Sequence, residues 1–597
     1  MKVLKIIKFI FIALIIIYII LLTNNSFIGA EHLEYFGYIK SIVHDFDLNI
    51  VNNFEDDIFY YGISKTYNLA DFHQHGGIII WVPFYIFGNI LKSFLQSLSS
   101  FLHINLQINF DSIPETVLCL STPILGITII ILIFWLLKKY YNKKIIFSSL
   151  FLITFGIPFI LYSIYLPGQQ NIVAAFFGVL LIIYINNISD KKDVNSWFFL
   201  GILFSLCFIV KLDLWFHIIT ISTYLIYIFI RDKDLKSISK ICISFSFGIL
   251  PCLSLKIINS YIMYGVIKIG ELSTINTSYS IFPDLLFSEY RGMFFISPIL
   301  YACVLGASLS LFFVSKNYII PVIFGIKKIN ISTSSKDEDF TNLKNTYNFK
   351  MLMLCFLITF IIKTIIRSRG FAWGGDSLNR AIIADFPLFV FLLCELFSII
   401  KLKNKGLIIA LILLLPLLIW TILNSLLFHF GPDDPINLSE KLSLIIWLIK
   451  SYEIINIFYM AFIGNINTIT EKAFFLAITL ILLSLIFIIY KIIKNKIFNK
   501  TLSISLKKTM TIFILYSLFF YLITTILNIS FNQINVDKMK KQNFFSGIEI
   551  SNPEQFAANE NMNSMTEMIH VYNAQKKYKK VKQIEKTLQE YRDKVYK

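Results

Sequence analysis

Acidic, basic and aromatic residues interrupt the apolar runs of this 597-residue chain at a few points, and they are the first candidates for chemistry. The stretch FAWGGDSLNR at 371–380, for example, combines paired glycines, a tryptophan, an aspartate and an arginine between two apolar runs. A carboxylate can take a proton from an attacking hydroxyl group, and the fork of an arginine binds two phosphate oxygens at once. Acids and arginines brought together therefore suit a reaction in which a hydroxyl attacks and a phosphate leaves.

Most of these residues lie near the ends of apolar runs rather than inside them. In chain order the candidates are Glu31, His32, Glu34, Tyr35, Asp45, His73, Gln169, Lys211, Arg291, Trp373, Asp376 and Arg380. A single charge at a membrane boundary can simply extend to the aqueous surface, and Arg367, close to the end of its run, invites that interpretation. A whole set of acids and cations on one face favours a functional site, because ionisable groups in a membrane are costly.

The elements that must position these residues are membrane helices. The chain is 56% hydrophobic and only 15% charged, whereas soluble domains are about 25% charged. Many apolar runs approach the roughly 20 residues that cross a bilayer. We expect an all-α polytopic protein with about thirteen transmembrane helices, at 6–22, 117–137, 145–165, 172–185, 197–210, 214–230, 241–258, 293–314, 351–366, 381–400, 407–428, 474–490 and 511–529.

Positive charge orients these helices, because the cytoplasmic loops of membrane proteins are rich in lysine and arginine. Lys2, Lys5 and Lys8 lie before and at the start of the first run, so the N-terminus is predicted to be cytoplasmic. The sidedness of all later loops depends on whether the apolar stretch 77–95 crosses the membrane. If it lies at the outer surface instead of crossing, the lysine blocks that start at 138, 231, 401 and 491 all face the cytoplasm. We adopt this solution, which places the candidate residues on the outer face of the plasma membrane and the C-terminus outside the cell.

Two parts are expected along the chain. Residues 1–530 form the membrane bundle, with interfacial helices in a first outer loop at 24–115, and residues 531–597 form an extracytoplasmic helical tail. Apolar residues at spacings of three and four between 571 and 595 predict an amphipathic helix in that tail.

Composition also weighs against two classes of site. The net charge of +17 comes mostly from the short lysine blocks between apolar runs, so it indicates topology and not a nucleic-acid partner. The seven cysteines all lie in apolar runs without a CxxC pair, which indicates neither disulfides nor a zinc site.

The motifs on the predicted outer face resemble those of the GT-C glycosyltransferases, a superfamily that includes protein O-mannosyltransferases and the lipid A aminoarabinose transferase. AEHLEYFGYIKSIVHDFDLNIVNN at 30–53 is similar to the pattern D-E-x-x-Y-L-x-x-A-R-S-L-x-x-D-G-D-L-x-x-x-N of bacterial members. Glu31 falls on the first acid, and Asp45 and Asp47 fall on the later acids. His32 replaces the second acid and Phe46 the glycine. Because of those departures no cofactor is assigned, and a divalent metal stays an open question.

Three later stretches match in the same order. FHQHGGIIIWVPFYIFG at 72–88 is similar to H-P-x-G-x-x-x-x-x-x-P-x-Y-x-x-G, beginning at His73. LLFSEYRGMFFISPIL looks like the stretch around R-G-L-x-x-x-x-P, carried by Arg291. WGGDSLNR resembles W-x-G-G-x-S-x-G-x-R, from Trp373 to Arg380. The resemblance runs from the first apolar run to about residue 400, and the part after 430 has no match that we can name.

The resemblance implies a GT-C bundle that moves a sugar from polyprenyl phosphate to a glycan, lipid or protein acceptor at the outer membrane surface. It implies Glu31 as general base with His32, Glu34 or Asp45 as helpers, donor-phosphate binding by Lys211, Arg291 and Arg380, and substrate contacts from Tyr35, His73, Gln169, Trp373 and Asp376. An oligosaccharide polymerase or ligase is an alternative enzyme. A lipid or ion transporter is the alternative without chemistry, and its acids should lie at mid-membrane on broken helices.

Overall fold

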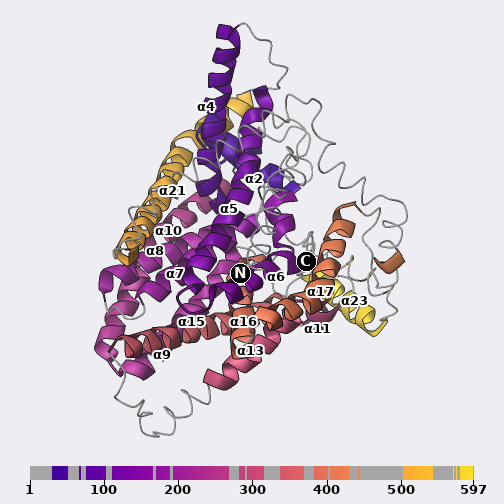
Figure 1. The fold of residues 1–597 in the computed structure, drawn as a ribbon. Helices are drawn as coiled ribbons and strands as arrows, with labels where there is room; N and C mark the ends of the chain where they lie inside the picture. The colour runs from indigo at the N-terminus through magenta and orange to yellow at the C-terminus, as the bar shows by residue number, and fades with distance from the viewer. Residues whose placement is uncertain are drawn as a thin grey trace.

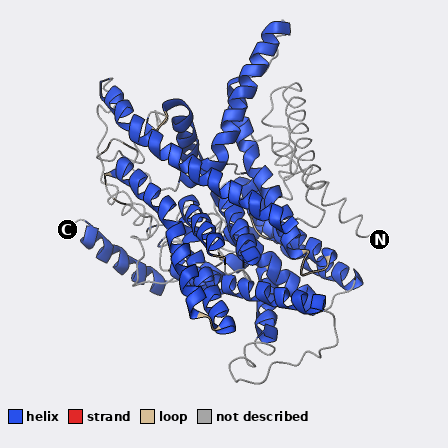
Figure 2. Cartoon of the chain, turned by 90° about the vertical axis from the view of Figure 1, so that its left-hand side faces the viewer, coloured by secondary structure: helices blue, strands red, loops and turns tan. Residues whose placement is uncertain are grey.

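The protein is helical, and in the part of the chain that the structure describes it contains no strand (Figures 1 and 2). This computed structural model describes residues 30–51, 66, 68, 75–102, 110–165, 168, 170–188, 193–265, 267, 282–288, 292–314, 337–368, 382–400, 404–430, 441–443, 502–541, 566, 569, 573 and 578–595. Within these residues, nine helices are long and apolar enough to cross a membrane. The prediction of an all-α, multi-pass membrane protein is therefore confirmed.

Eight of the nine helices coincide with predicted transmembrane helices. They are α5 (Ile113–Leu137), α7 (Gln170–Ile188), α9 (His217–Asp232), α10 (Leu235–Tyr264), α15 (Asp337–Arg367), α16 (Phe386–Ile399), α17 (Asn404–Phe430) and α21 (Leu502–Lys541). The ninth is α4 (Ile78–Leu102), from the predicted outer loop. The predicted runs 6–22 and 474–490 lie outside the described residues, so the total of thirteen stays a prediction.

Three further predicted helices differ from these nine. Helix α8 (Val194–Val210), with 17 residues, covers the predicted run 197–210 and begins three residues before it. Helix α6 (Lys143–Gly156) ends before Pro158, and a π-helix (Leu161–Tyr165) follows. The run 293–314 breaks at Pro298 into α12 (Met293–Ile296) and α13 (Leu300–Val314). Proline lacks an N–H donor and pushes the preceding residue out of the helical region, which explains both breaks.

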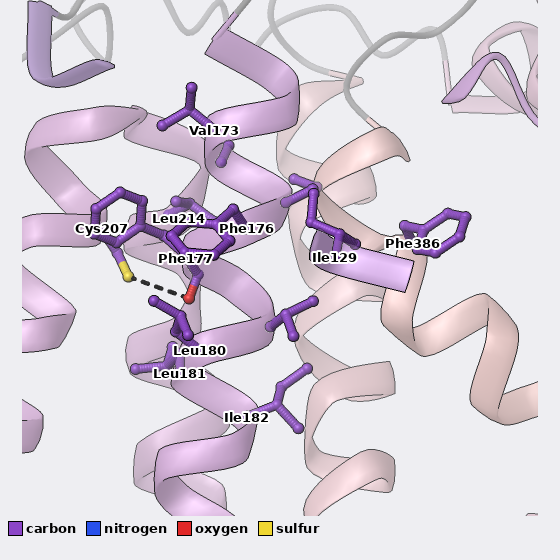
Figure 3. Packing of buried hydrophobic residues seen from close by; sticks show 14 of the residues in the cluster. Ile129, Val173, Phe176, Phe177, Leu180, Leu181, Ile182, Cys207, Leu214 and Phe386 are labelled. Carbon is purple, nitrogen blue, oxygen red and sulfur yellow. Dashed lines mark hydrogen bonds between the residues drawn. The ribbon is translucent and has the colours of Figure 1, made fainter. Parts of the chain in front are cut away.

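Helix α7 occupies the centre of the bundle. It is apolar on every side, and 89% of its membrane-length window is buried, as expected for a helix that other helices surround. Figure 3 shows Phe176 and Phe177 of α7 among other buried apolar side chains. The Cys207 thiol of α8 lies 3.9 Å from the Phe177 carbonyl oxygen, so α8 packs directly against α7. Helices α5, α10, α15, α16 and α21 pack around this pair.

The bundle has two chemically different ends, which the pairing of its helices defines. Helices α8 and α10 run in the same direction and pack with Gly201 against Gly248. Helix α9, which connects them in sequence, runs in the opposite direction. Helix α15 runs antiparallel to α9, because the Tyr227 hydroxyl donates to Asn348 at one end while Arg367 meets Asp213 at the other. The first end also contains the blocks 138–144 and 231–240, and we call it the lysine end. As predicted, these two blocks share one end.

Helix α4 starts at the end opposite the lysines and extends away from them. A Cβ atom on Gly76, in the turn that precedes α4, would collide with the backbone of Ile209 and Val210 at the end of α8. A Cβ atom on Gly88, further along α4, would meet Pro114 in the first turn of α5. The distal part of α4 projects beyond the other helices at the top of Figure 1. It therefore does not run between the two ends as α7 does.

The tail helix α23 (Tyr578–Val595) has the predicted amphipathic character. Its apolar residues Val581, Ile584 and Leu588 are buried, while lysines on its other face are exposed. Lys580 forms an ion pair with Asp284 of the short helix α11 (Phe282–Phe287). The proposed start of this tail at 531 falls inside α21, which continues to Lys541.

Candidate functional site

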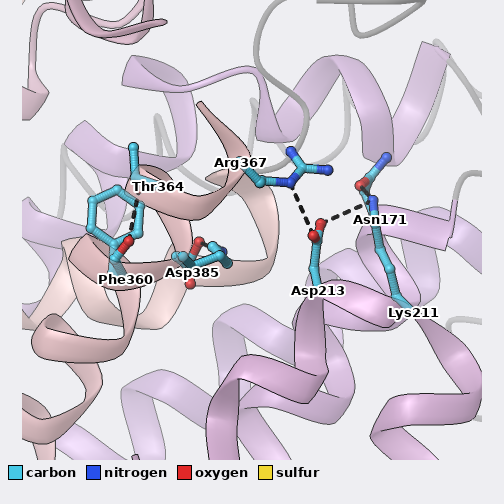
Figure 4. Close-up of polar contacts among 8 residues, drawn as sticks. Asn171, Lys211, Asp213, Phe360, Thr364, Arg367 and Asp385 are labelled. Atoms are coloured by element: carbon cyan, nitrogen blue, oxygen red, sulfur yellow. Dashed lines mark hydrogen bonds and ion pairs between the residues drawn. The ribbon is translucent and has the colours of Figure 1, made fainter. Parts of the chain in front are cut away.

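A group of buried charges occupies the end of the bundle opposite the lysine end (Figure 4). Its members come from α7, from the turn after α8, from the end of α15 and from the turn before α16. We call it the charge cluster, and it consists of Asn171, Lys211, Asp213, Lys363, Arg367 and Asp385.

Asp213 is the centre of the first half of the cluster. The apolar run of α8 stops at Lys211, whose backbone is extended, and Asp213 lies in the 3-10 turn that follows (Leu212–Phe216). The Arg367 Nε donates to Asp213 Oδ1 at 3.0 Å, and the Lys211 Nζ lies 3.8 Å from Asp213 Oδ2. Lys211 also donates to the side-chain oxygen of Asn171, in the first turn of α7. One carboxylate thus contacts two cations.

The second half of the cluster is a pair buried deeper in the bundle. Lys363 lies one turn before Arg367 on α15, and it forms an ion pair with Asp385, which precedes α16. Both side chains are almost fully buried. His217 is also buried near this end, with its ring stacked on Phe356 at a centroid distance of 4.7 Å.

The cluster presents positive charge on its open side. Among the residues that the structure describes, its three cations and two carboxylates give a net charge of +1 when all are ionised. The cations are also more exposed than the acid between them. The side chains of Arg367 and Lys211 are 26% and 17% exposed, and that of Asp213 is 10% exposed. A site with this arrangement favours an anion, because the carboxylates lie behind the cations.

The segment that contains α4 also reaches this end of the bundle. The turn His75–Gly77 touches the end of α8 just before Lys211. Trp81, one turn into α4, fills the space beside Gly77, and its ring lies 5.3 Å from that of Tyr35. Tyr35 belongs to α2 (Ala30–Lys40), the helix that carries the predicted acids. The acidic helix and the charge cluster are therefore on the same end of the protein.

The predicted acids take different positions on and after α2. Glu31 and His32 lie in its first turn, and Glu34 is fully buried. Asp45 ends the π-helix Ser41–Asp45 that continues α2, and it is only partly buried.

Asp47, which had no predicted role, is held in place by several hydrogen bonds. It is 2% exposed and accepts from the Ser41 hydroxyl, from the Asn49 amide and from the Asn535 side chain of α21. Burial raises the pKa of Asp47 above its ordinary value, although these three hydrogen bonds act to lower it. Phe46 has a φ of 60°, the left-handed conformation that favours the glycine of the family pattern.

Several predicted residues cannot be placed in this geometry. His73, Gln169, Arg291, Trp373, Asp376 and Arg380 lie outside the described residues. Lys211 is the one predicted phosphate-binding residue that the described part of the chain contains, and its neighbours are now known.

The structure adds three cluster residues, gives Asp213 a place between two cations and corrects the interpretation of Arg367. Asn171, Lys363 and Asp385 were not predicted. A lysine and an aspartate inside apolar runs were the available signal for the pair, because an isolated charge there would be costly. Arg367 does not simply extend to the membrane surface, as its place near a helix end suggested, since it binds Asp213.

The lysine end contains a second buried acid, Glu395 of α16. Its carboxylate accepts from the hydroxyl of Tyr141 and lies 3.0 Å from the Nζ of Lys350 on α15. Burial and the neighbouring carboxylate raise the pKa of Tyr141 well above its ordinary value. Here one acid is matched by one cation and one hydroxyl.

Metal ligands and known relatives give no further guide to the site. Within the part of the chain that is described, no group of three or more histidine, cysteine, aspartate or glutamate side chains could hold a metal ion. Comparisons with known protein families, with curated proteins and with solved structures find no match.

Proposed function

We propose that this protein is a membrane glycosyltransferase of the GT-C type, which transfers a sugar from a polyprenyl-phosphate donor to a glycan, lipid or protein acceptor. The observation that carries the proposal is the charge cluster, in which Lys211 and Arg367 form a partly exposed cationic surface backed by Asp213. It lies at the ends of membrane helices, which is the depth at which a lipid phosphate resides in a bilayer.

In the proposed reaction an acceptor hydroxyl oxygen attacks the anomeric carbon of the sugar. The bond between that carbon and the phosphate oxygen breaks, and polyprenyl phosphate leaves with the bonding electron pair. Glu31 of α2 takes the hydroxyl proton. Lys211 and Arg367, together with Arg291 and Arg380, stabilise the charge that develops on the leaving phosphate. His32, Glu34 and Asp45 keep their proposed auxiliary roles.

The distribution of charge favours this enzyme over a transporter. Acids that bind a transported ion belong near mid-membrane. The acids that pair with Lys363 and Lys350 lie just before α16 (Asp385) and near its far end (Glu395). No charged residue lies between these two acids on α16, or between Lys350 and Lys363 on α15.

The proposed orientation places the lysine end in the cytoplasm and the charge cluster on the outer side. Single cysteines at positions 240 and 582 test it, because both native lysines are exposed. An impermeant maleimide applied to whole cells should label position 582 and spare position 240 until the cells are lysed. The reverse pattern would overturn the orientation.

The proposed activity itself is tested with purified protein in detergent. A panel of polyprenyl-phosphate hexoses and pentoses is incubated with extracted envelope glycans, lipids and proteins, and released polyprenyl phosphate is measured. Release should depend on both donor and acceptor. Lys211→Ala should weaken binding of polyprenyl phosphate about 10- to 100-fold, the range of one charged hydrogen bond, while the exposed Lys240→Ala should not. Donor movement across vesicles without release from any donor would favour the transporter.

A further inference from the structure

Helix α21 contacts the turn after α2 through asparagine side chains. The Leu48 amide donates to Asn528 Oδ1 at 3.1 Å. Asn535, two turns later, donates to the Asp45 carbonyl oxygen at 3.0 Å and to Asp47 Oδ2 at 2.9 Å. The neighbouring Ile529 and Ile534 are exposed and apolar. The asparagines therefore mark one polar face on a helix whose outer surface suits lipid.

The turn that these asparagines hold is strained. Phe46 has φ 60° and ψ 29°, a conformation that residues with a side chain rarely adopt. Such a residue persists when its surroundings fix it. Asp47 accepts from Ser41 and from the Asn49 amide on the inner side, and the Phe46 ring lies 5.7 Å from that of Phe531 on α21. Residues 45–49 are thus held from both sides.

Helix α21 is itself fixed to the membrane bundle at the same level. The Asn528 side-chain amide donates to Asn259 Oδ1 at 3.2 Å, and Asn259 donates to the Thr525 hydroxyl at 2.9 Å. Both asparagines are fully buried. Asn259 belongs to α10, which packs along α8. Helix α8 ends at Val210, directly before Lys211 of the charge cluster. A continuous set of contacts therefore joins the charge cluster to the turn at 45–49.

We propose that α21 is a positioning clamp for the acidic helix α2, with Asn528 and Asn535 as positioning residues and Asp47 as their anchored partner. The π-helix Ser41–Asp45 continues α2 without a break, so a fixed turn at 45–49 also fixes the direction of α2. The catalytic part of this inference rests on the proposed function, because only then do the acids of α2 act on a substrate. In this proposal Asp47 anchors the helix, and Glu31 keeps the role of general base.

Hydrogen exchange tests the clamp without any assay of activity. Full-length wild type in detergent is compared with Asn528→Leu, Asn535→Leu and the control Gln533→Leu, whose native side chain is exposed on the same helix. Exchange in the peptide that contains residues 41–51 should speed up at least about tenfold in both asparagine variants, while the control matches wild type. Unchanged exchange in both variants would overturn the clamp. Phe531→Ala, which removes only the ring contact, is the milder variant if an asparagine variant does not fold.

Kinetics then test the positioning role. Misplacing a catalytic group by about 1 Å can cost 100-fold in rate, so Asn535→Leu should lower kcat about 10- to 100-fold. The KM for the donor and the binding of polyprenyl phosphate should stay within about threefold of wild type. Asn535→Gln, which keeps the amide, should recover part of the rate. Faster exchange with normal kcat would overturn the positioning role. A wild-type protein that transfers from no donor contradicts the proposed function and the positioning role with it, while the exchange data still decide whether α21 clamps the turn.

Discussion

Helices α15 and α16 are joined by two ion pairs, one near each end of α16. At the charge-cluster end Lys363 of α15 meets Asp385 before α16, and at the lysine end Lys350 meets Glu395. At the lysine end the Tyr141 hydroxyl also donates to Glu395, and the charges of Lys350 and Glu395 cancel. At the other end a second acid contacts two further cations that are partly exposed. A buried pair alone thus indicates a structural connection, and surplus charge beside it indicates a binding site.

The largest expected effect comes from breaking the deeper pair. Lys363→Met leaves Asp385 buried without its cation, which typically costs about 3–5 kcal/mol of folding free energy. The double variant Lys363→Met/Asp385→Leu should recover most of that loss, because no charge is left buried. Thermal unfolding in detergent measures both. If the double variant is as unstable as the single one, the pair is not the reason for the loss.

Arginine at the open side of the cluster should matter for the donor. Arg367→Ala should weaken polyprenyl-phosphate binding about 10- to 100-fold, the equivalent of one charged hydrogen bond. Arg367→Lys should fall between that and wild type, because lysine keeps the charge and loses the fork. Arg231→Lys at the lysine end is the matched control and should bind normally. Equal effects at the two ends would mean that the positive surface is not specific.

Tyrosine at the lysine end should affect stability alone. Tyr141→Phe removes the hydroxyl that donates to Glu395, and the loss of one hydrogen bond to a charged group costs about 1.5–3 kcal/mol. Unfolding in detergent should report this loss, and binding of polyprenyl phosphate should be unchanged. A variant that is stable but no longer binds the donor would reverse the roles of the two ends.

The smallest expected effect is the pH dependence of Asp47. Its folded-state pKa is raised, so protonation stabilises the folded state relative to the unfolded one. Wild type should therefore gain stability relative to Asp47→Asn as pH falls from 7 toward the unfolded value of about 3.9, and lose this gain as pH rises through the folded pKa. Unfolding temperatures of both proteins at pH 7 and pH 5 measure the difference. A gain on raising the pH would contradict the assignment.

Apolar length and lysine position were enough to predict the class of fold. Eight of the predicted helices and the common end of the lysine blocks 138–144 and 231–240 follow from those two properties. The breaks at Pro158 and Pro298 show where length alone misled, although the prolines were visible in the sequence.

The candidate site was harder to predict because its members meet only through tertiary packing. Lys211 and Asp213 are neighbours in sequence, whereas Arg367 reaches them from another helix. The pairing of Lys363 with Asp385 depends on the register between α15 and α16, which a hydrophobic pattern does not specify. The role of Asp47 depends on Asn535, in a part of the chain without any recognised motif.

Photo-crosslinking tests the central claim, that the charge-cluster end binds the donor phosphate, most directly. Polyprenyl phosphate with a photoreactive group on its first isoprene unit is bound to the purified protein and irradiated, and the labelled peptides are identified by mass spectrometry. We expect saturable labelling around Asn171, Lys211 and Arg367, which excess unlabelled polyprenyl phosphate removes and Lys211→Ala reduces. Saturable labelling around Tyr141 and Arg231 at the lysine end would contradict the account.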